Sequence, residues 1–421
     1  MFLGGADQSP SDGIRPPSVK GALRFWWRAL NWGRFRAVAG DDALALRELH
    51  KEEADLFGLA ADGKGGSGQG CFLLTVQHDE LNATEKGTVH PEFKPTKQRI
   101  NKGGKKVPDE NHLAAARYLG YGLMTAFTIK DNVTHQIKSH AGQLNRGCLD
   151  ENQTFIVTLT FRDKIDKSVL KALKALGLLG GLGSRLRHGM GSIALEKIVC
   201  DKQEIWTAPT TQEDYIKEVK DLLGSFANIP EPAYSAFSKE SRVNVLLSAN
   251  TPYEVLDQFG MKMLDYRSWG RTVDGKRLPL PSGNKSEERF KDDHHWFREA
   301  DTFRKACPNF HPKRVEFGLP HNYDSKDKKH MVNGEIHERR ASPLLFHVHH
   351  LSDNEYIGVG IYLPALFLPA GENIMAGYNP VMQNITWTVI TDFLYGRVGD
   401  TTATPKPMAP FRFQNKKAVL P

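Results

Sequence analysis

The glycine-rich segment GGLGSRLRHGMGS, from Gly180 to Ser192, is the strongest constraint that this sequence places on its fold. It joins a helical pattern at Lys167–Leu179 to a predicted strand at Ser192–Val199. A dinucleotide-binding glycine motif follows a strand and opens a helix, so the order of elements here excludes such a motif. The P-loop pattern GxxxxGK[ST] is absent as well.

The chemistry of this segment favours an anion. Glycine lets backbone N–H groups come close to a phosphate because no Cβ intervenes, and alternate residues of an extended segment point to the same side. A flexible connection without a ligand is the alternative interpretation. We expect phosphate contacts from Arg185, Arg187 and His188, and close backbone approach at Gly181, Gly183, Gly189 and Gly191.

A second basic feature lies nearer the N-terminus, in RPPSVKGALRFWWRALNWGRFRA from Arg15. The pattern predicts a helix from Ser18, as its cap, to about Phe35. Cations at intervals of four lie along one helix face, and they suit single-stranded nucleic acid because they neutralise phosphates while nearby rings stack on bases. The alternative is an amphipathic helix with buried tryptophans and a solvated basic face. The residues concerned are Lys20, Arg24 and Arg28, beside Trp26, Trp27 and Trp32.

Two further patterns carry less chemistry. The basic stretch Lys94–Lys106 contains no acidic residue and is typical of a solvated loop, although it could also clamp a phosphodiester backbone. Nine of the 16 histidines lie from His294 to His350, with Cys307 among them. No pair of them has a recognised ligand spacing, so we predict neither a metal nor another cofactor. Nucleophile elbows and HExxH are absent.

The alternation of elements predicts an α+β chain with two domains. Prolines in ANIPEPAYSA mark a boundary between residues 1–226 and 240–421. Strands and helices restart in a similar order after the boundary, around a His-rich insertion at about 270–340. In this half we expect strands at Val243–Leu247, Ser342–His349 and Ile357–Leu368, and helices at Tyr253–Trp269 and Val381–Leu394.

Composition limits the partners and the compartment. The net charge of +7 permits a polyanionic partner without requiring one. The four cysteines are scattered, as in a chain with reduced thiols. The N-terminus lacks the pattern of a signal peptide, and the most apolar stretch is too short to cross a bilayer. We therefore expect a cytoplasmic protein without a membrane partner.

Several of these blocks, in their order along the chain, resemble the RAMP superfamily. They are FLGGAD, IRPPSVKGALRFWWRAL, GGLGSRLRHGMGS, VEFGLP and RRASPL. The block PPSVKGALRFWWRA narrows the resemblance to the first RAMP subunits of the Cmr complex, the type III-B CRISPR RNA-guided effector. The resemblance implies two tandem ferredoxin-like (RRM-like) units of βαββαβ order, with loop and helix insertions. Such proteins usually carry a strand before FLGG, so we expect an open strand position in the first sheet.

The resemblance also implies a function. It indicates a non-catalytic RNA-binding subunit, near the end of the complex that carries the 3′ part of the guide, in antiviral defence. Its partners would be the guide crRNA, single-stranded target RNA and other RAMP subunits. An RNP1-type aromatic motif is absent, so we expect RNA contacts from the first helix, the glycine segment and the inserted loops. The alternatives are a RAMP endoribonuclease, with His188 as base, and an assembly scaffold.

Overall fold

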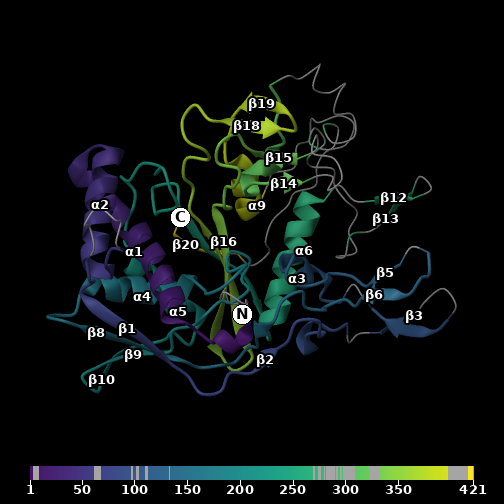
Figure 1. Cartoon of the computed structure of the whole chain (residues 1–421), viewed down its shortest axis with the longest axis horizontal. Coiled ribbons are helices and arrows are strands. Elements are labelled where there is room, and N and C mark those ends of the chain that lie inside the picture. The colour runs from purple at the N-terminus through teal and green to yellow at the C-terminus, as the bar shows by residue number, and fades with distance from the viewer. Residues whose placement is uncertain are drawn as a thin grey trace.

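The computed structural model describes the whole chain except residues 3–8, 61–67, 96–97, 101–103, 110–111, 132, 269–270, 274–275, 279, 281–289, 291–292, 294–295, 297–308, 323–330, 397–415 and 421. The described part is an α+β fold, as predicted, and every named strand pair in it is antiparallel (Figure 1). Four residues of the predicted histidine and cysteine group lie outside the described residues: His294, His295, His330 and Cys307.

The N-terminal half begins with a helical hairpin of α1 (Pro16–Ala39) and α2 (Asp42–Phe57). Prolines occupy the first turn of α1, where a backbone N–H needs no partner. The N-cap residue is therefore Arg15, and the predicted cap at Ser18 is wrong. The three tryptophans of α1 are at most 2 % exposed, so they belong to the core, as the alternative interpretation predicted.

The strands of this half form small sheets. Strand β1 (Phe72–Gln77) pairs with β8 (Ile156–Phe161), and α4 (Lys167–Leu179) follows as predicted. The predicted strand at Ser192 starts only at β9 (Lys197–Cys200), which pairs with β10 (Gln203–Thr207). Helix α5 (Gln212–Leu223) completes the half.

An insertion separates β1 from β8. Its helix α3 (Ala114–Leu119) is shorter than the predicted His112–Phe127, because the chain turns at Gly120. Its hairpins extend away from the central strands in Figure 1, whereas α3 lies near the centre of the fold. Its short strands pair as β2 (Ala83–Thr84) with β7 (Cys148–Leu149), β3 (Gln98–Ile100) with β4 (Lys106–Pro108), and β5 (Ile129–Lys130) with β6 (Ile137–Ser139).

One edge of β8 has no partner strand among the described residues. The Arg162 N–H donates to the Cys71 carbonyl at 3.0 Å, and this register turns the backbone groups of Val157, Leu159 and Phe161 away from β1. Within the described part of the chain, no strand pairs with them. The expected open position in the first sheet stays a prediction, because residues 3–8 lie outside the described residues.

The C-terminal half contains the largest sheet, with the strand order β16 (Leu344–Ser352), β17 (Glu355–Tyr362), β11 (Arg242–Ala249) and β20 (Lys417–Leu420). Helix α6 (Pro252–Arg267) follows β11, and α9 (Thr388–Tyr395) precedes β20. The predicted helix at Val381–Leu394 is wrong in its first part, because Val381 lies on a strand. The remaining strands are β12 (Arg271–Val273) with β13 (Lys276–Leu278), and β14 (His321–Asn322), β15 (Met331–Gly334), β18 (Asn373–Ala376) and β19 (Asn379–Met382).

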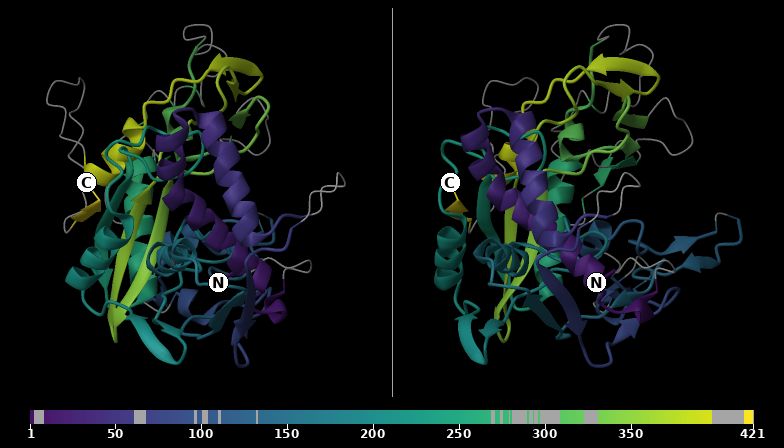
Figure 2. Two further views of the ribbon diagram at one scale, coloured as in Figure 1. Left: turned by 90° about the vertical axis from the view of Figure 1, so that its left-hand side faces the viewer. Right: turned by 60° about the vertical axis from the view of Figure 1, so that its left-hand side comes forward.

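Both faces of the large sheet are covered, which explains the nearly continuous apolar sequence of β16 and β17. Ile357, Val359 and Ile361 pack into the core that contains α1, α4 and α5. Phe346 and Tyr362 pack with α6 and α9 on the other face. Figures 1 and 2 show the long strands between these helices. The sheet therefore joins the two halves.

None of the helices in the described residues combines the length and the apolar character that a membrane crossing needs.

Candidate nucleic-acid interface

A cleft of about 1030 Å³ lies between the two halves. The glycine-rich segment is held against β16 there, because the Phe346 N–H donates to the Arg187 carbonyl at 3.0 Å. The cleft brings together four of the five sequence blocks on which the family resemblance rests. Six segments line it: residues 18–26 of α1, 118–121, 181–188, 263–267 of α6, 317–321 and 339–345.

The charge of the cleft is one-sided. Five arginines line it, and no aspartate or glutamate occurs among the described residues of its wall. Aromatic rings accompany the cations, and Tyr121 is 69 % exposed. A wall of this kind attracts a polyanion and offers rings on which bases can stack. The charged, titratable and aromatic residues of the cleft wall include Arg185, Arg187, Arg267, Arg339, Arg340, His188, His321, Phe25 and Tyr121.

Arg187 and Arg340 are two half-buried arginines of this wall. Arg187 Nη1 donates to the Ser342 carbonyl at 2.6 Å. Burial, together with the charge of Arg340, lowers the pKa of Arg187 to about 10. Burial also lowers the pKa of Arg340, and Glu231 opposes this effect. In the described part of the chain, the buried Nε and Nη2 of Arg340 have no hydrogen-bond partner. A buried guanidinium nitrogen without an acceptor is costly. A phosphate bound in the cleft would supply the acceptor that Arg340 lacks.

His188 lies deeper than its sequence position suggests. Its Nδ1 donates to the Leu119 carbonyl at 2.9 Å. Burial lowers its pKa to about 4, and the neighbouring arginines act in the same direction. The imidazole is therefore neutral near pH 7 and a weak base. Arg185 is exposed, and its Nη2 donates to the Tyr121 carbonyl.

The glycines of the segment approach the protein's own backbone. A Cβ at Gly183 would lie 2.3 Å from the Phe2 carbonyl oxygen, and one at Gly191 would lie 2.2 Å from that of Leu182. A Cβ at Gly181 would lie 2.6 Å from the Gly191 oxygen. The close approaches that the structure shows thus differ from the predicted approach to a phosphate, and they shape the cleft wall. Gly189 similarly lies against the ring of Phe346.

The predicted basic stripe of α1 points away from the cleft. Arg24 Nε lies 2.6 Å and Arg28 Nη1 3.1 Å from Glu53 Oε1, and the Glu53 side chain is 2 % exposed. Lys20 Nζ lies 5.7 Å from the centre of the Phe72 ring. The stripe therefore faces α2 and β1, and two of its charges are paired. The cleft-facing residues of α1 are instead Ser18, Gly21, Ala22, Phe25 and Trp26.

Two other predicted groups stay apart from the cleft. His347 and His349 share one strand face, as predicted, but both are buried, and a ring nitrogen of one lies 3.2 Å from a ring nitrogen of the other. Of the basic stretch Lys94–Lys106, Lys97 and Lys102 lie outside the described residues, and no described residue of it lines the cleft.

The sequence reasoning missed the arginines of the C-terminal half. Arg339 and Arg340 stand in RRASPL, which supported the resemblance but was not chosen as a site. An adjacent arginine pair next to a predicted strand is the signal that could have found them. A group able to hold a metal, in the insertion, was also missed because its members are far apart in sequence.

Comparisons with known proteins agree with the resemblance. A family model of the RAMP superfamily matches residues 1–194, which confirms the resemblance over this part of the chain. The CRISPR system Cmr subunit Cmr1-1 of Pyrococcus furiosus is 26 % identical over 269 residues, or 60 % of this chain and 65 % of that protein. The match thus spans just under two thirds of the relative's length.

Two solved structures are similar to this chain. One is the crystal structure of Cmr1 from Pyrococcus furiosus in its apo form, with a TM-score of 0.41, 18 % identity and 91 % of each chain covered. The other is a chain of the cryo-EM structure of the type III-B Cmr-beta bound to cognate target RNA. It has a TM-score of 0.42, 14 % identity, and coverage of 86 % of this chain and 92 % of that chain.

Proposed function

We propose, with the RAMP superfamily match over residues 1–194 as the premise, that this chain is a non-catalytic RNA-binding subunit of a type III-B Cmr effector complex. Its partners are then the guide crRNA, single-stranded target RNA and other RAMP subunits. The observation that carries the proposal is the arginine cleft, whose described wall holds five arginines and no carboxylate.

The proposal includes two tandem ferredoxin-like units, at residues 1–226 and 240–421. In the second unit the chain order β11–α6–β16–β17–α9–β20 and the sheet order β16–β17–β11–β20 support a βαββαβ arrangement. In the first unit α1, β1, β8 and α4 follow in the same order. The open edge of β8 is where the first strand of such a unit would pair.

The chemistry of the cleft favours recognition of the RNA phosphates over recognition of a particular base sequence. Arginines that contact phosphates position a strand without reading it, so binding should tolerate many sequences and weaken with salt. The cleft volume of about 1030 Å³ lies just above roughly 300–1,000 Å³, the usual range of small-molecule sites, so the cleft can admit a segment of polymer.

The environment of His188 favours a binding role over nuclease activity. A general base works best with a pKa near the operating pH, whereas the pKa of His188 is lowered to about 4. The described cleft wall also holds no carboxylate that could orient an imidazolium.

The test uses the purified chain and labelled single-stranded RNA. A mobility shift is followed by a denaturing gel of the same sample, and we expect shifted, intact RNA. The Arg187→Gln, Arg340→Gln double variant should lose the shift. Arg34→Gln is the control because Arg34 already pairs with Glu52 at 2.6 Å, outside the cleft. Absence of a shift would overturn RNA binding by this chain. RNA shortened by the protein but not by His188→Ala would identify a nuclease.

A further inference from the structure

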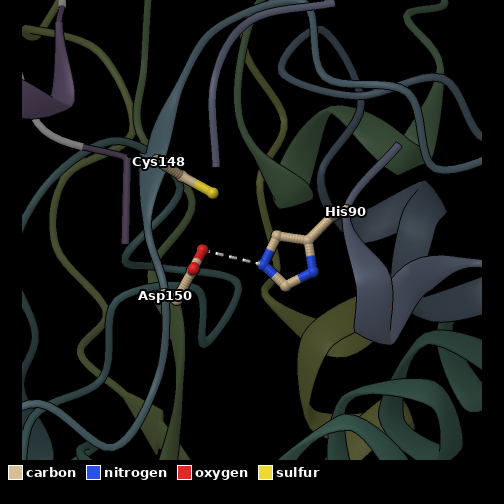
Figure 3. Close-up of side chains that lie close together, drawn as sticks. All are labelled: His90, Cys148 and Asp150. Atoms are coloured by element: carbon tan, nitrogen blue, oxygen red, sulfur yellow. Dashed lines mark ion pairs between the residues drawn. The ribbon is translucent and has the colours of Figure 1, made fainter. Parts of the chain in front are cut away.

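A buried group of metal-ligating side chains lies in the insertion between β1 and β8 (Figure 3). His90 precedes a short 3-10 helix at Pro91–Phe93, Cys148 lies on β7, and Asp150 follows that strand. One ligand atom from each of the three lies within 4.8 Å of the others. His90 is 4 % and Cys148 3 % exposed, and Asp150 is half-buried. None of the three lines the arginine cleft.

The bonding of His90 is incomplete. Its Nε2 faces Asp150 Oδ1 at 3.4 Å, which is long for an N–H···O hydrogen bond of roughly 2.9 Å. Its Nδ1 is buried and has no hydrogen-bond partner in the described part of the chain. Figure 3 shows Nδ1 on the side of the ring away from Asp150, so Nε2 is the nitrogen available to an ion shared with Asp150 and Cys148.

We propose that His90, Cys148 and Asp150 form a binding site for a divalent metal ion, with zinc as the ion that fits the set. An imidazole nitrogen, a thiolate sulfur and a carboxylate oxygen are the three donor types that Zn²⁺ takes in proteins. Three protein ligands leave the fourth position of a tetrahedral ion for water.

The separations agree with this assignment. Around a tetrahedral zinc ion with bonds of about 2.0–2.3 Å, neighbouring ligand atoms lie roughly 3.3–3.8 Å apart. The 3.4 Å between His90 Nε2 and Asp150 Oδ1 falls within that range. Cys148 Sγ lies within 4.8 Å of both ligand atoms and is the third donor of the group. A separation that is poor for a hydrogen bond is therefore suitable for two ligands of one ion.

The surroundings hold the Asp150 carboxylate in place and keep the Cys148 thiol protonated until a metal binds. Thr84 Oγ1 donates to Asp150 Oδ1 at 2.7 Å and fixes the carboxylate, as outer partners of metal ligands commonly do. Burial raises the pKa of Cys148 to about 11, so the metal-free thiol is protonated. Metal binding would break the S–H bond, form a sulfur–metal bond and release the proton to solvent. The Met1 amine is the cation beside the group; it donates to the Leu149 carbonyl, and burial lowers its pKa.

A metal at this position would tie His90 to β7. The same insertion supplies Tyr118, Leu119 and Tyr121 to the cleft wall, so the ion would stiffen one side of the cleft. The inference does not depend on RNA binding, because it rests on a separate group of residues and its test contains no RNA.

The test uses Co²⁺ as a spectroscopic substitute for zinc. The full chain, first treated with a chelator, is titrated with Co²⁺ and followed by near-ultraviolet absorption. We expect a thiolate-to-cobalt charge-transfer band that saturates at one equivalent and disappears when Zn²⁺ is added. Cys148→Ser should lose the band, and Asp150→Asn, which keeps the shape of the side chain, should weaken binding at least tenfold. Cys200→Ser is the matched control and should keep it, because Cys200 lies outside the group.

Circular dichroism separates binding from folding in these variants. Absence of the band in the folded parent chain would overturn the proposal. A band that persists in folded Cys148→Ser, or Co²⁺ binding that is unchanged in folded Asp150→Asn, would also overturn it. If a variant does not fold, the parent titration decides alone, since a thiolate band at one equivalent that Zn²⁺ removes supports the site.

Discussion

The arginine cleft predicts how the affinity for RNA changes with salt. Each phosphate contact with a single strand contributes about 0.7 to the slope of log K against log salt concentration. If Arg187 and Arg340 each neutralise one phosphate, the double glutamine variant should flatten the slope by about 1.4. Between about 50 and about 200 mM salt the parent chain should then lose about sevenfold more affinity than the variant.

The two positions should differ in the size of their effect. A hydrogen bond to a charged group contributes about 1.5–3 kcal/mol, or roughly 10- to 150-fold in affinity. Arg340 should show this effect in full because its buried Nε and Nη2 have no protein acceptor in the described residues. Arg187 should show less, since one of its N–H groups is already bonded to the Ser342 carbonyl.

The assay is fluorescence anisotropy of a labelled uridine-rich RNA over a salt series, with urea denaturation of each variant as a folding check. Arg340→Gln removes a repulsion with Arg187 and an attraction to Glu231, so the stability of the free protein should change little. Arg34→Gln should leave both slope and affinity unchanged. An unchanged slope in the folded double variant, or an equal change in the control, would refute the assignment of the cleft.

Two further predictions concern stability. Gly183→Ala places a side chain at a φ of +83°, with its Cβ 2.3 Å from the Phe2 oxygen, so it should cost at least about 1–2 kcal/mol in urea denaturation. Gly21→Ala, at an exposed position of α1 with open space around it, should instead stabilise by about 0.5–1 kcal/mol, and equal effects at both sites would contradict this explanation. Burial lowers the pKa of His347 from 6.5 to about 4, so its contribution is complete above pH 6.5 and is lost as the pH falls toward 4. The free energy of unfolding from urea denaturation should fall by about 2 kcal/mol between pH 8 and pH 5 because of this residue. An equally steep fall in His347→Gln would contradict this.

Local elements were predictable where the local signals agree. Helix α4 has the predicted bounds because Asp166 caps it and its apolar residues recur with helical spacing. Helix α9 and the predicted Val381–Leu394 helix differ because an apolar run does not distinguish a strand from a helix, and Val381 pairs with Ile374 on β18.

The site was predictable only in part, because periodicity identifies a helix face but not its neighbour. The spacing of Arg24 and Arg28 correctly places them together. Their partner Glu53 lies on the next helix, and no local pattern in the sequence indicates that its carboxylate is directed at them. The same limit applies to His90 and Cys148, which the fold brings together across 57 intervening residues without any ligand spacing.

The cleft could not have been predicted from one half of the chain alone. Arg187 and Arg340 repel each other, and neither half alone provides both. They meet because the glycine-rich segment folds tightly on its own backbone and lies along β16, where the Arg187 carbonyl accepts the Phe346 N–H. The glycines thus contribute to anion binding by positioning the segment, while the charge comes from arginines of both halves. A strand of RNA in the cleft would neutralise a repulsion that the interface between the halves creates, so RNA binding and the packing of the two halves should stabilise each other.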